Sequence, residues 1–528
     1  MSAVRKIVVV GSGMAATRLV EELVAAGRPP TGSTSEASTP NGATKSLHVT
    51  VLGDEPHAPY NRILLSALLE GTHHPDALTL RSPEWYAEHG VDLRLGARVL
   101  GVDREHRDVM LVDGTVVPYD RLVLATGSIP SLPPIRGLVR LDGRLHERVH
   151  AFRSLDDCTR LMGALVELGV PEARGLGTNR NISAPDAAVW DQTATPTATA
   201  RRGPVRAVVV GGGLLGLQVA RALSVRGLQN EIVEGGEHLL RSQVGNPAGQ
   251  VLARGLRRLG TTVYTGARAV RLTDSDTGDG SVGLRLDNGF TLETDLVVLT
   301  AGGRPSTALA RGAGLEVNRG IVVDDHLASV TDPDIHALGD CAEHGGRTTG
   351  FVPPAWEQAT LLARRLLGED VAYAGSRSVA RLRATGLDVA VLGDPERAAR
   401  EGGEVVEVTN PVVGSHRKLV VRDGVIVAAT LVGDLSRIGL ITQYYDRGSR
   451  LSGTEPGALL MGDRQAPPTR LPEDAEICAC AGVSAGRIRA CASLEEVRET
   501  TRATTGCGGC SAAVRQLLDT RPALSGTS

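Results

Sequence analysis

The sequence is poor in aromatic residues and lysine, and it contains no long apolar run. Phe, Trp and Tyr make up 2% of its 528 residues, and only Lys6, Lys45 and Lys418 are lysines among 57 basic residues. The formal net charge of −3 provides no electrostatic footprint for nucleic acid. No window approaches the roughly 18 uninterrupted apolar residues that a membrane-spanning helix needs. Nucleic-acid binding and membrane insertion are therefore excluded as expected functions.

The N-terminus superficially imitates an export signal, but we do not expect it to act as one. Arg5 and Lys6 precede an apolar run, but Gly11 and Gly13 break that run, and charged residues follow. The chain also lacks the even cysteine set of a secreted disulfide framework, because it has seven cysteines and most of them crowd near the C-terminus. We expect a cytoplasmic protein with a metal or cluster site in its tail.

The chain contains an internal sequence repeat. Its two copies, Lys6–Ala16 and Arg206–Gly216, are 200 residues apart. In each copy a Val-rich strand runs into a glycine cluster that opens an amphipathic helix. The first glycine permits the tight turn, the second lets a pyrophosphate approach the backbone, and the third small residue allows close packing. Two dinucleotide sites are predicted, with phosphates at the helix N-termini. Their candidate residues are Gly11, Gly13, Ala15 and Ala16 in the first unit and Gly211, Gly213, Leu214, Leu215 and Gly216 in the second.

Each unit also has a candidate acid for a ribose. Glu234 ends a strand about twenty residues after Gly213, and its carboxylate is predicted to bind the ribose hydroxyls. Because that carboxylate repels a 2′-phosphate, we predict that NADH is preferred over NADPH; the alternative is a solvated glutamate at a strand end. In the first unit the acids are Asp54 and Glu55, one or two positions later than usual.

The length of the chain, 528 residues, predicts three to four domains. Abundant Gly and Val favour an α/β architecture. Two stretches without hydrophobic period, Pro29–Ser46 and Ala173–Pro204, are interpreted as surface insertions. After about Val371 short strands between turn residues indicate a small α+β domain, with strands expected at 387–392, 405–409, 418–421 and 425–431. A proline-containing linker, Gln465–Pro472, leads to the cysteine-rich tail.

Further motifs occur in the order seen in the two-dinucleotide, glutathione reductase-like flavoproteins, and the resemblance spans roughly Lys6–Leu367. Leu124–Pro130 resembles the segment where the chain leaves the FAD domain, and Thr300–Pro305 the exit from the NAD domain. Thr331–Asp340 resembles the second FAD fingerprint, in which the aspartate binds the ribityl chain and the glycine admits the pyrophosphate. The residues that this resemblance assigns to cofactor binding are Val99, Ala125, Thr126, Gly127, Gly302, Gly339 and Asp340.

The segment Asp54–Ser66 carries a more specific resemblance. It is similar to the same stretch in the large subunit of NAD(P)H-dependent nitrite reductases and in nitrate-assimilation electron-transfer subunits. It implies that Arg62 lies against the flavin. Pro354–Ala359 resembles the same family's helix start near the flavin ring and adds Trp356 to the cofactor-binding set; an ordinary helix start with a buried tryptophan is the alternative. Neither nucleotide unit has a Cys-x4-Cys or Cys-x2-Cys pair, so Cys158 and Cys341 are interpreted as small buried residues and disulfide reductase chemistry is disfavoured.

The tail carries Cys478-x-Cys480, 26 intervening residues, and Cys507-x2-Cys510. Four thiolates can bind a [2Fe-2S] cluster or zinc, and Cys507 with Cys510 could instead form a redox disulfide. The surrounding sequence, about Glu476–Leu518, resembles the bacterioferritin-associated-ferredoxin-like (BFD-like) [2Fe-2S] domain. We favour the cluster, since a flavin upstream gives it electrons to carry one at a time, and we do not expect Cys491 to be a ligand.

These resemblances imply an α/β fold with two Rossmann-like domains, a small α+β domain and a small helical [2Fe-2S] domain. The expected bounds are 1–135 with 305–370 for FAD, 136–304 for NAD, 373–464 for the α+β domain and 473–522 for the BFD-like domain.

The expected function is oxidation of NADH at FAD, with single electrons leaving through the cluster to a separate assimilatory nitrate or nitrite reductase. We expect no obligatory catalytic acid or base, and, because this sequence ends at Ser528, we do not expect the chain to reduce nitrite alone. The alternatives are a stand-alone reductase of ferredoxin or rubredoxin type and a non-enzymatic iron–sulfur binding or sensing module. Whether the chain forms a homodimer is left open.

Overall fold

The computed structural model describes most of the chain. The described residues are 5–26, 47–171, 203–275, 280–377, 379–384, 386–451, 455–461, 471–478, 481–504 and 510–519. The expected insertion Pro29–Ser46, nearly all of Ala173–Pro204, most of the linker Gln465–Pro472 and the cysteines Cys480 and Cys507 lie outside these ranges.

The first dinucleotide unit is built on a five-stranded parallel sheet of order β19-β7-β1-β2-β3. Its strands are β1 (Arg5–Val10), β2 (Leu47–Leu52), β3 (Val91–Arg94), β7 (Arg121–Leu124) and β19 (Ile335–Ala337). Helices α1 (Met14–Ala26) and α8 (Val352–Leu366) pack against each other beside it. A parallel sheet covered on both faces needs apolar residues at successive positions, which explains why Ile7, Val8, Val9 and Val10 are all buried.

A smaller antiparallel sheet completes this unit. Its strands β4 (Val99–Asp103), β5 (Asp108–Leu111) and β6 (Val116–Pro118) contribute Val109, Leu111 and Val117 to the same core. Because β19 comes from a segment two hundred residues after β7, this unit joins two distant stretches of sequence. The local strand pattern alone could not have paired them.

The second unit repeats the layout with parallel strands in the order β12-β11-β10-β16-β9. The strands are β9 (Val149–Ala151), β10 (Arg206–Val210), β11 (Gln229–Glu234), β12 (Thr261–Thr265) and β16 (Leu296–Leu299). Its helices are α4 (Leu155–Glu167), α5 (Leu214–Val225) and α6 (Asn246–Arg258), and an antiparallel sheet is formed by β13 (Ala269–Asp274), β14 (Val282–Leu286) and β15 (Thr291–Thr294). The repeat seen in the sequence is therefore a structural repeat, and the predicted pair of Rossmann-like units is confirmed.

The two units are joined by strands that lie side by side. β8 (Ser128–Pro130) leaves the first unit and pairs antiparallel with β17 (Gly303–Pro305), which returns from the second. The short elements η1 (Arg62–Leu64), α2 (Leu65–Glu70), η2 (Pro75–Leu78) and α3 (Pro83–Glu88) follow β2, and α2 packs on α5 of the second unit. The return path adds α7 (Ala308–Gly312), β18 (Ile321–Val323), η3 (Gly339–Cys341) and β20 (Ala342–His344).

The third region is a five-stranded antiparallel sheet of order β21-β22-β25-β24-β23. It comprises β21 (Val379–Ala384), β22 (Leu387–Leu392), β23 (Glu404–Asn410), β24 (Ser415–Arg422) and β25 (Val425–Val432), with α9 (Pro395–Arg400), α10 (Ile438–Arg447) and α11 (Pro456–Leu460). The four expected strands are present within a few residues, and β21 is an additional strand that the sequence pattern did not indicate. Ala380 and Leu382 of β21 share one core with Val219 and Ala220 of α5.

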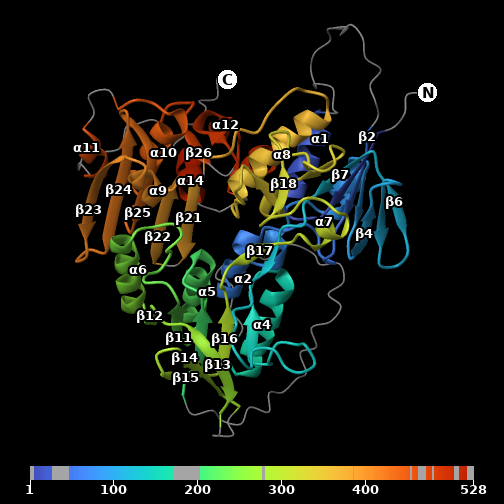
Figure 1. The fold of residues 1–528 in the computed structure, drawn as a ribbon. Helices are drawn as coiled ribbons and strands as arrows, with labels where there is room; N and C mark the ends of the chain where they lie inside the picture. Colours follow the sequence, from blue (N-terminus) through green and yellow to red (C-terminus); the bar gives the residue numbers. More distant parts are fainter. Residues whose placement is uncertain are drawn as a thin grey trace, which may run out of the picture.

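The cysteine-rich tail forms a small cluster of elements with its own core. The hairpin β26 (Glu476–Cys478) and β27 (Val483–Ser484) precedes α12 (Ala485–Arg489), α13 (Leu494–Thr501) and α14 (Ser511–Asp519). Val483, Ile488, Val497 and Val514 are fully buried in it. In Figure 1 these red elements lie between the orange sheet of the third region and helices α1 and α8. No helix among the described residues is long and apolar enough to cross a membrane.

Candidate functional site

One large cavity, of about 1550 Å³, follows the carboxyl ends of the first sheet. Val10, Leu52, Ala125 and Leu338, at or just beyond the ends of β1, β2, β7 and β19, all line it, as expected for a ligand site in an open parallel sheet. Its size exceeds that of a pocket for an ordinary small molecule, so it suits an extended dinucleotide. The sequence-predicted residues that line it are Gly11, Gly13, Ala15, Asp54, Glu55, Arg62, Val99, Ala125, Thr126, Gly127, Leu214, Leu215, Gly339 and Asp340.

The first glycine loop has the shape that a pyrophosphate requires. Gly11 has φ +109°, and a Cβ there would lie 2.2 Å from the Ala125 carbonyl oxygen, so only glycine fits. At Gly13, by contrast, a Cβ would meet nothing within 4 Å, so the loop leaves open space just before α1. Gly339, from the distant fingerprint, lies opposite Ala15. These residues frame an open space at the start of α1 that is wide enough for a ligand to reach the backbone.

The second loop repeats this construction. A Cβ on Gly211 would lie 2.5 Å from the Thr300 carbonyl oxygen, and one on Gly216 would lie 1.9 Å from the Gly211 carbonyl oxygen. Gly213 is the N-cap of α5 and again faces open space. Gly211, Gly213, Gly216, Gly302 and Glu234 do not line the large cavity, whereas Leu214, Leu215 and Gln218 of α5 do. The start of α5 therefore connects the second loop with the cavity of the first.

The candidate acids have different environments. Glu234 accepts hydrogen bonds from the Gly212 N–H at 2.7 Å and the Gly236 N–H at 2.5 Å. It therefore links the turn that follows β10 with the turn that follows β11. The Arg241 side chain, which sequence reasoning missed, lies beside Gly236 and is exposed. In the first unit, Asp54 keeps 72% of its side chain exposed at the cavity, whereas the Glu55 carboxylate is bound to Arg62 and the Tyr60 hydroxyl. Asp54 lies 3.9 Å from the largely exposed Arg98, so it is the more accessible of the two acids.

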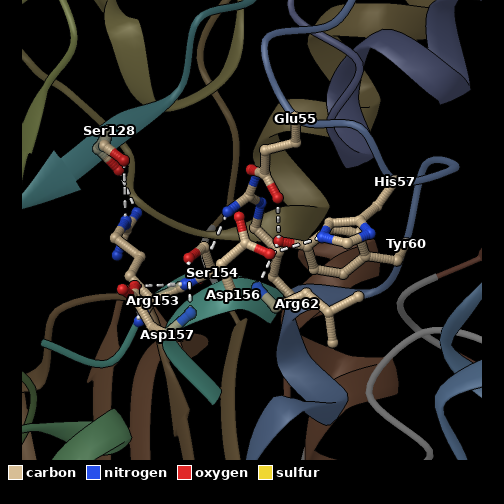
Figure 2. Close-up of polar contacts among 10 residues, drawn as sticks. Glu55, His57, Tyr60, Arg62, Ser128, Arg153, Ser154, Asp156 and Asp157 are labelled. Carbon is tan, nitrogen blue, oxygen red and sulfur yellow. Dashed lines mark hydrogen bonds and ion pairs between the residues drawn. The ribbon is translucent and has the colours of Figure 1, made fainter. Parts of the chain in front are cut away.

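A polar network ties the second unit to the cavity wall (Figure 2). The Arg153 guanidinium donates from Nε to the Ser128 carbonyl oxygen at 2.9 Å and from Nη2 to Asp340 Oδ2 at 2.8 Å. Ser128 Oγ donates to the same Asp340 oxygen at 2.6 Å. Burial lowers the pKa of Arg153, and Asp340 opposes that shift. Asp340, expected to bind a ribityl chain, is therefore fixed in place by two side chains that sequence reasoning did not identify.

Arg62 lies in the same network, between Arg153 and Tyr60 in the view of Figure 2. Its guanidinium binds Glu55, donates to the Arg153 carbonyl oxygen at 3.4 Å and lies 5.0 Å from the centre of the Tyr60 ring. The Tyr60 hydroxyl donates to Glu55 at 2.7 Å and accepts from the Leu155 N–H at 2.9 Å. The arginine therefore presents a positive charge at the cavity in a fixed orientation.

Ala16 and Trp356 are buried and do not line the cavity. The Trp356 Nε1–H donates to the Met14 carbonyl oxygen at 3.2 Å, which holds α8 against the first turn of α1. Pro353, Ala355 and Glu357, from the same end of α8, do line the cavity. The structure gives Trp356 a supporting position and places the start of α8 at the site.

The two isolated cysteines are buried, and their thiols are engaged with backbone carbonyl groups. Burial raises the pKa of the Cys158 thiol to about 12 and also raises the pKa of the Cys341 thiol. Their Sγ atoms donate to the carbonyl oxygens of Leu65 at 3.6 Å and Leu124 at 3.2 Å. Since the thiolate is the reactive form, both side chains are inert at neutral pH.

In the tail, the structure describes two of the four expected cluster ligands. Cys478 and Cys510 are buried in the same small core, and the Thr504 N–H donates to Cys510 Sγ at 3.2 Å. Backbone N–H groups directed at sulfur tune an iron–sulfur centre, so this environment fits a cluster ligand. Over the described part of the chain, which omits Cys480 and Cys507, no three metal-ligating side chains gather. Cys491 donates to the Arg487 carbonyl oxygen at 3.3 Å, in keeping with a structural thiol.

The tail also reaches the large cavity. Glu476, two residues before Cys478, lines it together with Arg377, Arg381 and Asp446 of the third region. Burial raises the pKa of both carboxyl groups, Glu476 and Asp446, while the two arginines act against the rise at Asp446. Residues from both dinucleotide units, the third region and the tail therefore border one continuous space.

Comparison with known proteins agrees with this architecture. Residues 5–359 match the family model "Pyridine nucleotide-disulphide oxidoreductase", and residues 476–520 match "BFD-like [2Fe-2S] binding domain". The chain is 32% identical to the nitrite reductase [NAD(P)H] of Bacillus subtilis over 97% of this chain and 57% of that protein. It is 28% identical to the assimilatory nitrate reductase electron transfer subunit of the same organism over 97% of this chain and 59% of that subunit. The chain thus spans about half the length of these curated relatives.

Two further similarities concern smaller proteins. The rubredoxin-NAD(+) reductase of Alcanivorax borkumensis is 28% identical over 81% of this chain and 95% of that enzyme. Among solved structures, the putidaredoxin reductase–putidaredoxin complex superposes with a TM-score of 0.67 and 24% identity, covering 87% of this chain and 96% of that one. The three family resemblances drawn from the sequence are confirmed by the two matched family models and by the nitrite reductase and nitrate reductase electron transfer subunit relatives.

Proposed function

Because the chain belongs to the pyridine nucleotide-disulphide oxidoreductase family, we propose that it oxidises NADH at an FAD and passes the electrons through its own [2Fe-2S] cluster to a separate protein. FAD, a nicotinamide dinucleotide and a [2Fe-2S] cluster are the cofactors that its two family matches imply. The observation that carries the proposal is the shared cavity. Gly13, Leu215 and Glu476 line it from the first unit, the second unit and the cysteine-rich tail.

The chain's own residues would bind and orient the cofactors. A bound flavin supplies the exchange between a hydride and single electrons. The open space at Gly13 and the N-terminus of α1 receive a pyrophosphate, and Asp54 offers its exposed carboxylate to a ribose. Arg62 and the N-terminal end of α8 place positive potential at the cavity, which favours a ligand that gains negative charge. No residue needs to transfer a proton to the substrate, so positioning is the protein's main contribution.

We propose an assimilatory nitrate or nitrite reductase catalytic protein as the electron acceptor. The names of the Bacillus subtilis relatives support this choice. A stand-alone reductase of a rubredoxin-like protein is the second candidate, since the rubredoxin-NAD(+) reductase relative is covered over 95% of its length. Deleting residues 473–528 separates them: the first candidate loses acceptor reduction, whereas the second retains it.

The direct test is a visible spectrum of anaerobically purified protein before and after NADH, together with iron and acid-labile sulfide analysis. We expect flavin and cluster absorption that both bleach with NADH, and two iron atoms per chain as a [2Fe-2S] cluster requires. Colourless protein, or a tail that contains only zinc, would contradict the proposal. A protein that holds FAD without bleaching would support the non-enzymatic alternative.

Nucleotide preference provides a further prediction at Glu234. Its carboxylate lies at the end of β11, where it would repel a 2′-phosphate, and Arg241 lies nearby. Replacing Glu234 with Ser should lower the ratio of kcat/KM for NADH over NADPH by about tenfold or more, equivalent to about 1.4 kcal/mol. Steady-state kinetics with both nucleotides measures this ratio. Adding R241A to E234S should then reduce NADPH use again; an unchanged ratio in E234S would remove Glu234 from the ribose site.

A further inference from the structure

A buried ion pair joins the cysteine-rich tail to the first dinucleotide unit. The Arg502 guanidinium, directly after α13, binds the carboxylate of Glu21 in the middle of α1. Only 11% of the Arg502 side chain and 9% of the Glu21 side chain are exposed. A pair of opposite charges held this far from water is not a passing surface contact, because each charge would be costly to bury alone.

The surroundings of the pair are also shared between the two regions. Arg81 donates from Nε to the same Glu21 oxygen at 2.7 Å. Arg502 packs among Met14, Leu80 and Trp356, all of the first unit. Beyond the pair, Glu499 of α13 attracts Arg81, whereas Arg498 disfavours a positive charge on His73. The charge complementarity between α13 and the segment between α2 and α3 therefore rests on Glu499 and Arg81.

The backbone at Arg502 supports a specific role for its side chain. This residue is the C-cap of α13 with φ +61°, in the left-handed region where glycine is the usual choice. Glycine would adopt this conformation without strain but could not reach Glu21. Burial and the neighbouring Arg18 lower the pKa of Arg502 to about 10, so the guanidinium stays charged at neutral pH.

Met14 lies between the ion pair and the large cavity. It lines the cavity, and it also lines the small space bordered by Glu21 and Arg502. Glu476 brings the strand that ends in Cys478 to the same cavity from the tail. The tail therefore borders the cavity through Glu476 and is linked to the first unit by the buried ion pair.

We propose that the Glu21–Arg502 ion pair is the docking contact that holds the iron–sulfur region in position to take electrons from the flavin cavity. The inference rests on the proposed function, and it makes Glu21 and Arg502 positioning residues rather than cofactor ligands. When the pair is broken, NADH still delivers its hydride to the flavin, but the electrons no longer pass efficiently to the cluster.

The experiment compares R502Q, E21Q and the double variant as anaerobic holoproteins in a stopped-flow instrument. Flavin bleaching by NADH should keep its rate, whereas cluster reduction should slow by about tenfold or more in each single variant. E21Q leaves the Arg502 charge buried without its carboxylate, and R502Q leaves Glu21 bound to Arg81 but no longer linked to Arg502. The double variant should be no slower than the slower single variant. R502K, which retains the charge, should recover most of the rate.

A matched control is the exposed ion pair between Arg447 of α10 and Asp474 of the tail, 2.6 Å apart with side chains 48% and 67% exposed. D474N should change cluster reduction by less than about twofold, because exposed pairs contribute little.

Hydrogen exchange of α13 gives a readout that does not depend on electron transfer. The amides of Leu494–Thr501 should exchange faster in R502Q and E21Q than in the unaltered protein. Unchanged exchange together with unchanged cluster reduction in R502Q overturns the docking role. Failure of the unaltered protein to reduce its cluster with NADH would instead overturn the proposed function, and the exchange measurement would still test the docking contact. If R502Q fails to fold, E21Q and R502K provide the same comparison.

Discussion

Replacing Gly13 with Ala should give a folded protein that has lost most of its affinity for FAD. A Cβ at this position meets no protein atom within 4 Å, so the fold tolerates it. The methyl group would instead occupy the space where a pyrophosphate must approach the N-terminus of α1. Losing charge-assisted hydrogen bonds to the backbone should cost about 2–3 kcal/mol, or roughly 30- to 150-fold in affinity. Flavin content after gel filtration and FAD titration of the apoprotein measure the loss.

Two other glycines serve as controls for this prediction. Gly213→Ala has equally open surroundings in the second unit, so it should retain FAD and instead weaken NADH-dependent bleaching. Gly11→Ala should fail to fold, because its Cβ would lie 2.2 Å from the Ala125 carbonyl oxygen at a φ of +109°. If G13A purified with a full complement of FAD, the first loop would not be the pyrophosphate site.

Replacing Cys478 with Ser should remove the cluster and leave the flavin reaction intact. Cys478 ends β26 within the small core of the tail, whereas the glycine loops belong to separate sheets. A serine hydroxyl is a poor substitute for a thiolate on iron. The iron and sulfide content should therefore fall to less than about a tenth of that of the unaltered protein. FAD content and the rate of NADH-dependent flavin bleaching should stay unchanged. Elemental analysis and anaerobic spectroscopy of one preparation measure all three quantities.

The matched control is Cys491→Ala. This cysteine lies in the same core, but its thiol is engaged with the Arg487 carbonyl oxygen and contacts the Thr500 hydroxyl. C491A should keep the full iron content of the unaltered protein. Equal iron loss in C491A and C478S would mean that the tail is sensitive to any core substitution, and full iron retention in C478S would exclude Cys478 as a ligand.

These two predictions and the earlier one at Glu234 separate the entry and the exit of electrons. G13A affects the cofactor at which both meet, C478S affects only the exit, and E234S affects only the choice of donor. Each acts at a different place in the structure: just before α1, in β26 and in β11. Their effects should therefore add, except in combinations that remove the flavin itself.

Much of the site could be predicted from local sequence because turns are encoded locally. A glycine that needs a positive φ, as Gly11 and Gly211 do, leaves a signature within a few residues of its strand and helix. The spacing did not distinguish Asp54 from Glu55, because that choice depends on Arg62 and Tyr60, which engage only one of them. Strand β21 was missed for a similar reason: its partner in packing, α5, lies far away in the sequence.

The sequence by itself determined the two dinucleotide units, the third region and the cysteine spacing of the tail, since each follows from residues close together in the chain. Only the tertiary structure decided that Ser128 and Arg153 hold Asp340, that α5 and Glu476 border the same cavity, and that Arg502 binds Glu21. Those contacts join residues separated by tens to hundreds of positions. They depend on how whole sheets and helices pack, and no local pattern of hydrophobicity or turn residues specifies that packing.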